Sequence, residues 1–194
     1  MTGPDGMVAE IFAVFERHGA EGYGENVSQL DHALQCAQLA RDHDCPDTLV
    51  VAALLHDIGR MLQPAGNDGE RHGLDARHED VGAAALAGYF PPAVTEPIRL
   101  HVAAKRYLCA VDAEYRATLS DASLLSLKVQ GGAMTDQEVA QFRADPFFAE
   151  AIELRRFDDW GKRTGCPVAA LESYRPLIAA MIAKENTATT EVVT

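Results

Sequence analysis

The sequence predicts an all-α, single-domain helical bundle, and three observations lead to this prediction. The length of 194 residues corresponds to about one domain. Apolar residues recur at helical spacing through most of the chain, whereas no convincing segment alternates as a strand would and no internal repeat is present. Residues 46–58 are apolar on every side, which is typical of a helix at the centre of a bundle.

The first half of the chain carries clear helix start and stop signals. Ser28 and Asp31 have the spacing of a capping box, so a helix is expected from residue 28 to about 43. Pro46 suits the first turn of the next helix, and Gly59 is placed to end that helix. The composition of residues 63–75 predicts a loop, which we expect to cross over one end of the bundle.

The second half of the chain predicts at least five more helices. One is expected over 76–89, and Pro91-Pro92 separates it from another that ends near residue 108. Thr135 and Glu138 form a second capping-box pattern, and Pro146 and Pro167 introduce two further helices. We expect residues 1–20 to be an N-terminal helix or extension, 21–184 to form the domain that carries the site, and 185–194 to be a flexible tail.

Charge and composition exclude several classes of partner. The net charge of −12 argues against a surface for duplex nucleic acid or anionic membranes. No apolar run approaches the ~20 residues that span a bilayer, and the N-terminus lacks the pattern of a signal peptide. The four cysteines lie far apart in the chain and are expected to be reduced thiols. We therefore expect a cytoplasmic protein.

A set of histidines and aspartates suggests a metal site. His56 and Asp57 end the most apolar predicted helix, where burying two ionisable groups is costly unless something neutralises or binds them. Other predicted helices can add ligands to this pair, as successive helices do in metal-binding bundles; these are His32, His78, His101 and Asp158. Imidazole and carboxylate ligands suit iron, manganese or zinc, and the two oxygens of Asp57 can bridge two metals.

This pattern resembles the HD-domain superfamily, which is named for the His-Asp doublet and consists mostly of metal-dependent phosphohydrolases. The resemblance is closer to one group within it, the HD-domain mixed-valent di-iron oxygenases of organophosphonate catabolism, here called PhnZ/TmpB-like. It extends from about residue 25 to 174. The segments that carry it are 29–37, 52–59, 101–108, 119–123, 130–132 and 155–162. The resemblance implies an HD-domain helical bundle.

The resemblance also implies a ligand set and a reaction. It assigns one iron to His32, His56, Asp57 and Asp158, and a second iron to His78 and His101, with Asp57 bridging the two ions. Asp57, His78 and His101 would be the catalytic residues. In this group the phosphonate and the C1 hydroxyl reach one iron and dioxygen binds the other. The Fe(II)/Fe(III) pair abstracts the C1 hydrogen, and cleavage of the C–P bond releases phosphate and a carboxylate.

Three residues are predicted to bind the phosphonate. Lys105 follows His101 by four residues, so its ammonium projects from the same helix face as a metal ligand, which is favourable only if an anion lies between them. Ser123 can donate its hydroxyl to that anion. Arg155 lies one helical turn before Asp158 and offers a guanidinium fork.

Two positions depart from the pattern of the group. Arg60 stands where these oxygenases have a histidine near the phosphonate, and its permanent charge is expected to bind the phosphonate in place of that histidine. Tyr23 and Glu25 are two residues apart rather than three, in a glycine-flanked loop that we expect to cover the amine end of the substrate. Tyr107 and Asp112 are further candidates for contacts to the amine.

Because the departures lie where an amine would bind, the preferred substrate is (R)-1-hydroxy-2-(trimethylammonio)ethylphosphonate, giving glycine betaine and phosphate. The alternative substrate is (R)-2-amino-1-hydroxyethylphosphonate, which would give glycine. Either substrate implies an upstream hydroxylase in the same pathway. Two other classes remain open: an HD-type metal-dependent phosphohydrolase, which would not consume dioxygen, and a non-catalytic module that binds an anion.

Overall fold

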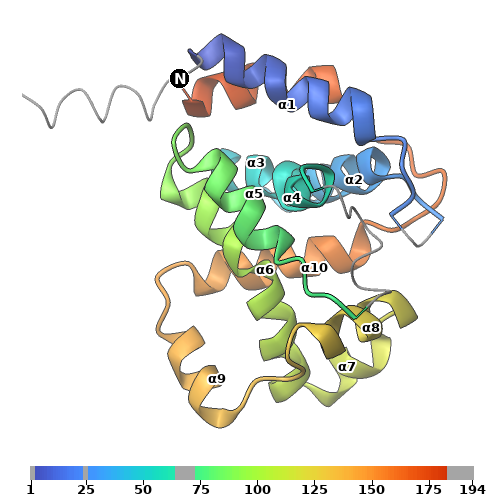
Figure 1. The fold of residues 1–194 in the computed structure, drawn as a ribbon, viewed down its shortest axis with the longest axis vertical. Coiled ribbons are helices and arrows are strands. Elements are labelled where there is room, and N and C mark those ends of the chain that lie inside the picture. The colour runs from blue at the N-terminus through green and yellow to red at the C-terminus, as the bar shows by residue number, and fades with distance from the viewer. Residues whose placement is uncertain (1–2, 24–25, 64–72, 183–194) are drawn as a thin grey trace, which may run out of the picture.

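The computed structural model describes residues 3–23, 26–63 and 73–182, and its regular elements there are helices (Figure 1). Apart from an isolated β-bridge between Gly22 and Ser28, these ranges contain no strand pairing. The all-α prediction is confirmed. The labelled elements are α1 (Pro4–His18), α2 (Gln29–Asp42), α3 (Asp47–Leu55), α4 (Ile58–Met61), α5 (His78–Leu86), α6 (Pro92–Val111), α7 (Ala113–Thr118), α8 (Asp121–Val129), α9 (Asp136–Arg143), α10 (Phe148–Trp160) and the 3₁₀ helix η3 (Leu171–Tyr174). Residues 175–182 are also helical.

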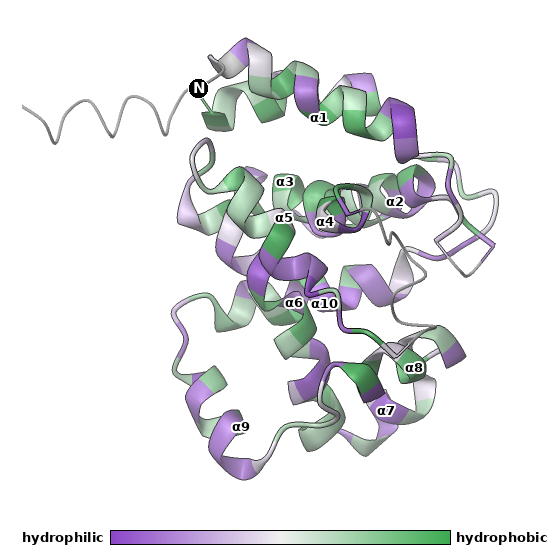
Figure 2. Ribbon diagram, viewed as in Figure 1, coloured by the Kyte–Doolittle hydropathy of each residue, from purple (hydrophilic) through white to green (hydrophobic). Residues whose placement is uncertain are grey.

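The main core surrounds α3. Every residue from 49 to 55 is buried, as expected for a central helix. Helices α2, α6 and α10 pack against α3, and the apolar face of α1 belongs to the same core through side chains such as Ile11 and Phe15. Figure 2 shows α3 as predominantly hydrophobic. Helices α2, α6 and α10 also carry three of the six predicted metal ligands.

A second, smaller core lies at the other end of the molecule. There the later turns of α6 pack with α9 and α10, and Tyr107, Phe142 and Phe148 form an aromatic cluster with ring centroids 5.1–5.5 Å apart. Thr135 and Glu138 make the predicted capping box at the start of α9. Figure 1 shows α9 at the end of the molecule remote from α1.

The structure corrects the prediction for residues 46–58. The helix that begins after Pro46 ends at Leu55, and His56 and Asp57 form a turn before the short helix α4. Gly59 therefore does not end a helix but lies inside α4. A Cβ atom at Gly59 would lie 2.0 Å from the carbonyl oxygen of His78, so the glycine permits close contact between α4 and α5.

Other boundaries differ by a few residues from expectation. Helix α5 begins at His78 rather than 76, and α6 continues to Val111 rather than ending near 108. Residues 64–72 of the predicted loop and the predicted tail at 185–194 lie outside the described residues. No helix within the described ranges has the length and apolarity needed to cross a membrane.

Candidate metal centre and substrate cavity

The six predicted metal ligands lie together in the core, although they come from five separate places in the chain. His32 projects from α2, His56 and Asp57 from the turn between α3 and α4, and His78 is the first residue of α5. The other two are His101 from α6 and Asp158 from α10. Each is at most 4% exposed. The bundle therefore brings together four imidazoles and two carboxylates out of contact with bulk water.

Asp57 lies at the centre of this cluster. Its Oδ2 is 3.4 Å from Nε2 of His56 and 3.8 Å from Nε2 of His32. Its Oδ1 is 3.0 Å from Nε2 of His78 and 3.7 Å from Nε2 of His101. Each carboxylate oxygen thus faces a different pair of imidazoles, which is the arrangement needed for a carboxylate that bridges two metal ions.

Hydrogen bonds to backbone carbonyls orient three of the imidazoles. Because a carbonyl can only accept, the bonded Nδ1 carries the proton and the lone pair of Nε2 points into the cluster. These bonds are His32 to Gly161 at 2.9 Å, His56 to Ala53 at 2.8 Å and His101 to Ile98 at 2.7 Å.

The close approach of the ring nitrogens requires a cation between them. Nε2 of His32 and Nε2 of His56 are 3.2 Å apart, and both are lone-pair acceptors in the tautomers set by their Nδ1 bonds. Nε2 of His78 and Nε2 of His101 are also 3.2 Å apart. Two lone pairs at this distance repel unless a proton or a metal ion binds them. The donor set therefore fits one metal ion at each pair.

The charge state of the cluster also indicates that it binds a cation. Burial alone would raise the pKa of Asp57, but Arg60, His56 and His78 hold that pKa well below its usual range. Burial lowers the pKa of His32 and, more strongly, that of His101. The ionised carboxylate of Asp57 nevertheless has one buried oxygen, Oδ2, that accepts no hydrogen bond from the described residues. Such an orphaned anionic oxygen is costly unless a cation binds it.

Asp158 and Cys36 both adjoin the His32–His56 pair. Asp158 Oδ1 is 3.5 Å from Nε2 of His32, and its pKa lies well below the usual range because Arg155 and Lys162 outweigh the effect of burial. Cys36 Sγ is 3.7 Å from the same nitrogen, but burial raises the pKa of this thiol well above its usual value. Since the thiol also donates to the carbonyl of Phe157, Asp158 is the better ligand.

A small basic cavity of about 40 Å³ adjoins the cluster, and His78, His101 and Asp158 contribute to its wall. Lys105 is only 3% exposed and donates to Oγ of Ser126 at 2.6 Å. The cationic side chains that line the cavity are Arg60, Lys105, Arg155 and Lys162, and Ser123 and Ser126 add hydroxyl groups. Buried cations at this density favour an anionic ligand.

Comparison with known proteins identifies the family. The HD domain family matches residues 30–125. The chain is 48% identical over 173 residues, which are 88% of this chain and 86% of the relative, to "Hydroxymethylphosphonate dioxygenase" of Gimesia maris. It is 40% identical over 179 residues, 92% of this chain and 91% of the relative, to "[1-hydroxy-2-(trimethylamino)ethyl]phosphonate dioxygenase (glycine-betaine-forming)" of Leisingera caerulea.

The chain belongs to the HD-domain phosphonate oxygenases. This confirms the resemblance predicted from the sequence motifs.

Tyr23 and Arg60, the positions where this oxygenase departs from the expected pattern, both lie at the metal cluster. The ring of Tyr23 stacks on His32 with centroids 3.8 Å apart, and its hydroxyl donates to Asp158 Oδ1 at 3.3 Å. Arg60 Nε donates to Asp57 Oδ1 at 3.1 Å. Tyr23 therefore covers the His32–His56 side, as a lid residue would. Glu25 lies outside the described residues.

Arg155 reaches the cluster through Asp158. Its Nη1 donates to Asp158 Oδ2 at 2.6 Å, while Nε donates to the hydroxyl of Tyr115 at 3.0 Å and Nη2 pairs with Asp159. The guanidinium is thus held on both sides by carboxylates, and Tyr115 in turn donates to Asp159 at 2.7 Å. Sequence reasoning predicted Arg155 but not these supporting residues.

Two further residues of the cavity were missed from the sequence. Lys162 follows Asp158 by four residues, and its Nζ lies 3.8 Å from Asp158 Oδ1. The one-turn spacing that predicted Lys105 from His101 would have found it. Ser126 follows Ser123 on α8, and its hydroxyl donates to the carbonyl of Ser123 at 3.1 Å. Its role depends on the contact with Lys105, which the sequence does not reveal.

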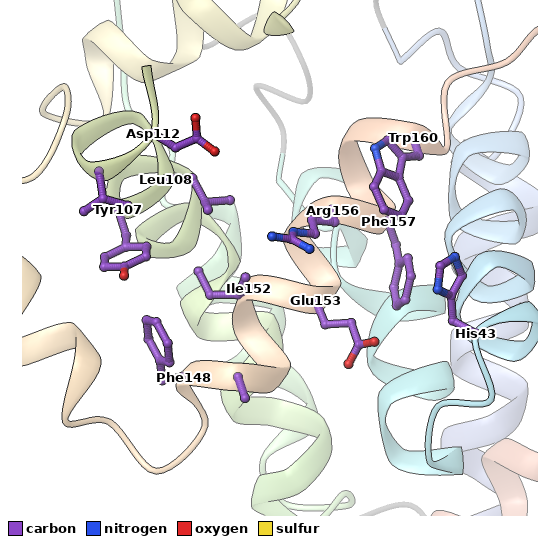
Figure 3. A pocket seen from close by; sticks show the side chains of 12 residues that line it. His43, Tyr107, Leu108, Asp112, Phe148, Ile152, Glu153, Arg156, Phe157 and Trp160 are labelled. Atoms are coloured by element: carbon purple, nitrogen blue, oxygen red, sulfur yellow. The ribbon is translucent and has the colours of Figure 1, made fainter. Parts of the chain in front are cut away.

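A larger hollow of about 640 Å³ lies apart from the metal cluster, between α6 and α10 (Figure 3). Figure 3 shows Tyr107 and Asp112 on one side of it and Phe157 and Trp160 on the other. None of the six cluster residues lines this hollow. Tyr107 and Asp112 do not line the basic cavity either, so their contact with a substrate amine stays a prediction.

Proposed function

We propose that this oxygenase uses dioxygen and two iron ions to cleave the C–P bond of a small 1-hydroxyphosphonate. The observation that carries the proposal is the position of Asp57, whose two oxygens face two separate imidazole pairs beside a basic cavity. Redox chemistry at two metals and recognition of a phosphonate would meet at this one place.

The proposed ligands follow from the geometry and the donor types. His32, His56 and Asp158 would hold one iron, His78 and His101 the other, and Asp57 would bridge them. A mixed-valent Fe(II)/Fe(III) pair would supply the oxidising chemistry that removes the C1 hydrogen. Nitrogen and carboxylate ligands, with the cysteine thiol protonated, suit iron in these oxidation states.

Residues of the chain bind and orient the substrate. Lys105 and Ser123 line the cavity on the side of α6 and α8 and would bind the phosphonate oxygens. Arg155 would add a contact while fixing Asp158. With the phosphonate held in this way, the C1 hydroxyl is directed toward the cluster. Tyr23 lies over His32 and would exclude water from that side.

The cavity supports hydroxymethylphosphonate as the first candidate substrate. Its volume is only about 40 Å³, and its lining holds four cationic side chains against one carboxylate, Asp158. The 48% identical relative carries the name of this activity. The reaction would convert HOCH₂PO₃²⁻ and O₂ to formate, HPO₄²⁻ and one proton.

The trimethylammonium substrate preferred on sequence grounds is the second candidate. The name of the 40% identical relative supports it, and so does the aromatic face of Tyr23 at the cavity, since a methylated cation binds well against an aromatic ring. Its ammonium end would need Tyr23 to move, because the ring now stacks on His32. Loss of the C1 hydrogen and of phosphate would then leave glycine betaine.

Both candidates need a hydroxyl on C1. We therefore propose that a phosphonate hydroxylase precedes this enzyme in the same pathway. We also propose that both enzymes act in the cytoplasm.

A substrate panel tests the proposal. Reduced, iron-loaded enzyme is given oxygen and hydroxymethylphosphonate, the trimethylammonium hydroxyphosphonate or the primary-amine hydroxyphosphonate, and released phosphate is measured. We expect the largest kcat/KM with hydroxymethylphosphonate. A larger value with the trimethylammonium substrate would reverse the order of the two candidates, and no phosphate from any of the three would refute the proposed function.

A further inference from the structure

A second cleft adjoins the basic cavity. It has a volume of about 460 Å³ and is formed by residues from the end of α6 to α8 together with α10. Ser123 and Lys162 line both this cleft and the 40 Å³ cavity beside the metal ligands. The two spaces therefore lie on either side of this pair of side chains. The cleft is named here the outer cleft.

Lys162 lies at the junction between the two spaces. Its Nζ donates to Ser123 Oγ at 3.3 Å, lies 3.8 Å from Asp158 Oδ1, and is 5.6 Å from the centroid of the Tyr23 ring. The side chain is 11% exposed. Its ammonium group thus contacts one wall of the cavity, a proposed iron ligand and the proposed lid residue, and it reaches the outer cleft as well.

Charge explains why such a junction residue is needed. A protein with a net charge of −12 repels a phosphonate dianion at long range, so entry depends on local cations. Arg156 is exposed at the outer cleft, Lys162 lies at the junction, and Lys105 lies in the cavity behind it. These three side chains give a path of positive charge from the surface to the metal cluster.

The carboxylates of the outer cleft are already engaged. Asp112 Oδ1 accepts the backbone N–H of Tyr115 at 3.0 Å, where it caps α7. Asp159 pairs with Arg155 and accepts the hydroxyl of Tyr115. Lys162 itself contacts Ser123 and Asp158, which belong to the wall of the basic cavity. The outer cleft can therefore admit an anion toward Lys162.

We propose that the outer cleft is the entrance for the substrate and that Lys162 is the residue that passes the phosphonate into the metal cavity. This inference rests on the proposed function, because it needs a phosphonate substrate. In binding, the incoming anion replaces the contact of Lys162 with Ser123 and is then taken over by Lys105. Released phosphate leaves by the same path in the reverse order.

Two matched pairs of variants test the proposal in the iron-loaded enzyme. Lys162→Met is compared with Lys128→Met, which removes the same charge from an exposed position on α8 that lines neither space. Thr118→Trp places an indole in the outer cleft, and Ala117→Trp places one on the exposed neighbouring position of α7. The measurements are iron content, kcat/KM from phosphate release, and the inhibition constant of inorganic phosphate.

We expect Lys162→Met to lower kcat/KM by about ten- to a hundredfold and to weaken inhibition by inorganic phosphate, with two irons retained. Lys162→Arg should restore most of the loss, and Thr118→Trp should lower kcat/KM by about tenfold or more with kcat little changed. Both control variants should match the parent enzyme. If Lys162→Met loses iron instead, the comparison of Thr118→Trp with Ala117→Trp tests whether the outer cleft is the entrance.

Equal kcat/KM in Thr118→Trp and Ala117→Trp would overturn the entrance, and parent-like kinetics in Lys162→Met would overturn the role of Lys162. Failure of the parent enzyme itself to release phosphate from any hydroxyphosphonate would instead refute the proposed function. The two failures are therefore distinguishable.

Discussion

The contact between α4 and α5 predicts that Gly59→Ala removes one metal ion from the centre. A Cβ atom at Gly59 would lie 2.0 Å from the carbonyl oxygen of His78 and 2.7 Å from the backbone nitrogen of Gly82. Both atoms belong to the backbone of α5, so no side chain can rotate away. Since Cβ contacts below 3.0 Å essentially do not occur, the two helices must separate by about 1 Å.

The displacement is large compared with the tolerance of a metal site. Metal–ligand distances vary by about 0.2 Å, so a shift of about 1 Å at His78 removes its nitrogen from the second metal. The strain of the added methyl group should also lower the free energy of unfolding by about 1–3 kcal/mol. Misplacing a catalytic centre by about 1 Å can cost roughly a hundredfold in rate.

Gly88→Ala is the matched control, because no atom lies within 4 Å of a Cβ at that position. Denaturant unfolding of the metal-free proteins, iron content after reconstitution and phosphate release are measured for both variants. We expect Gly59→Ala to hold about one iron per chain and Gly88→Ala to behave as the parent. Two irons and a parent-like unfolding midpoint in Gly59→Ala would refute the reasoning.

Three further predictions concern the site. Lys105→Met should raise the KM for the hydroxyphosphonate about ten- to a hundredfold without loss of iron, because a charge-assisted hydrogen bond contributes about 1.5–3 kcal/mol. An unchanged KM would show that Lys105 does not bind the phosphonate. Cys36→Ala should keep two irons, since its thiol stays protonated, whereas one iron fewer would make it a ligand. In the metal-free protein, Arg155 and Lys162 outweigh the effect of burial and lower the pKa of Asp158 in the folded state. The ionised carboxylate therefore stabilises the fold fully above its unfolded pKa of about 3.9. This stabilisation is lost as the pH falls from there through the folded pKa. The difference in unfolding free energy between the parent and Asp158→Asn should therefore be constant above about pH 5 and shrink in acid. A difference at about pH 3 as large as that at about pH 7 would contradict this.

Much of the fold follows from local sequence patterns. The uniform apolarity of residues 49–55 predicts the central helix, and Ser28 and Thr135 cap α2 and α9 as expected from their spacing. The break at His56-Asp57 was not predicted, because apolar residues lie on both sides of the doublet and Gly59 offered a later end for the helix. It depends on contact between α4 and α5, and one sequence read along its length does not show which helices touch.

The clustering of the six proposed metal ligands was easier to predict than the contacts of the residues around them. A buried His-Asp doublet is anomalous within a single helix, and the family motifs supply its partners. Tyr115 and Asp159 support Arg155 through contacts between α7 and α10. Ser126 matters only because Lys105 reaches it across the cavity. Such contacts join residues far apart in the chain, and no spacing rule identifies them.

The most direct test of a two-iron oxygenase is the ratio of dioxygen consumed to phosphate released. Reduced protein reconstituted with iron and supplied with hydroxymethylphosphonate is followed with an oxygen electrode and a phosphate assay, with and without air. We predict two irons per chain, one dioxygen consumed for each phosphate, and no phosphate without oxygen. Phosphate released at the same rate in the absence of oxygen would contradict the assignment and identify a metal-dependent hydrolase instead.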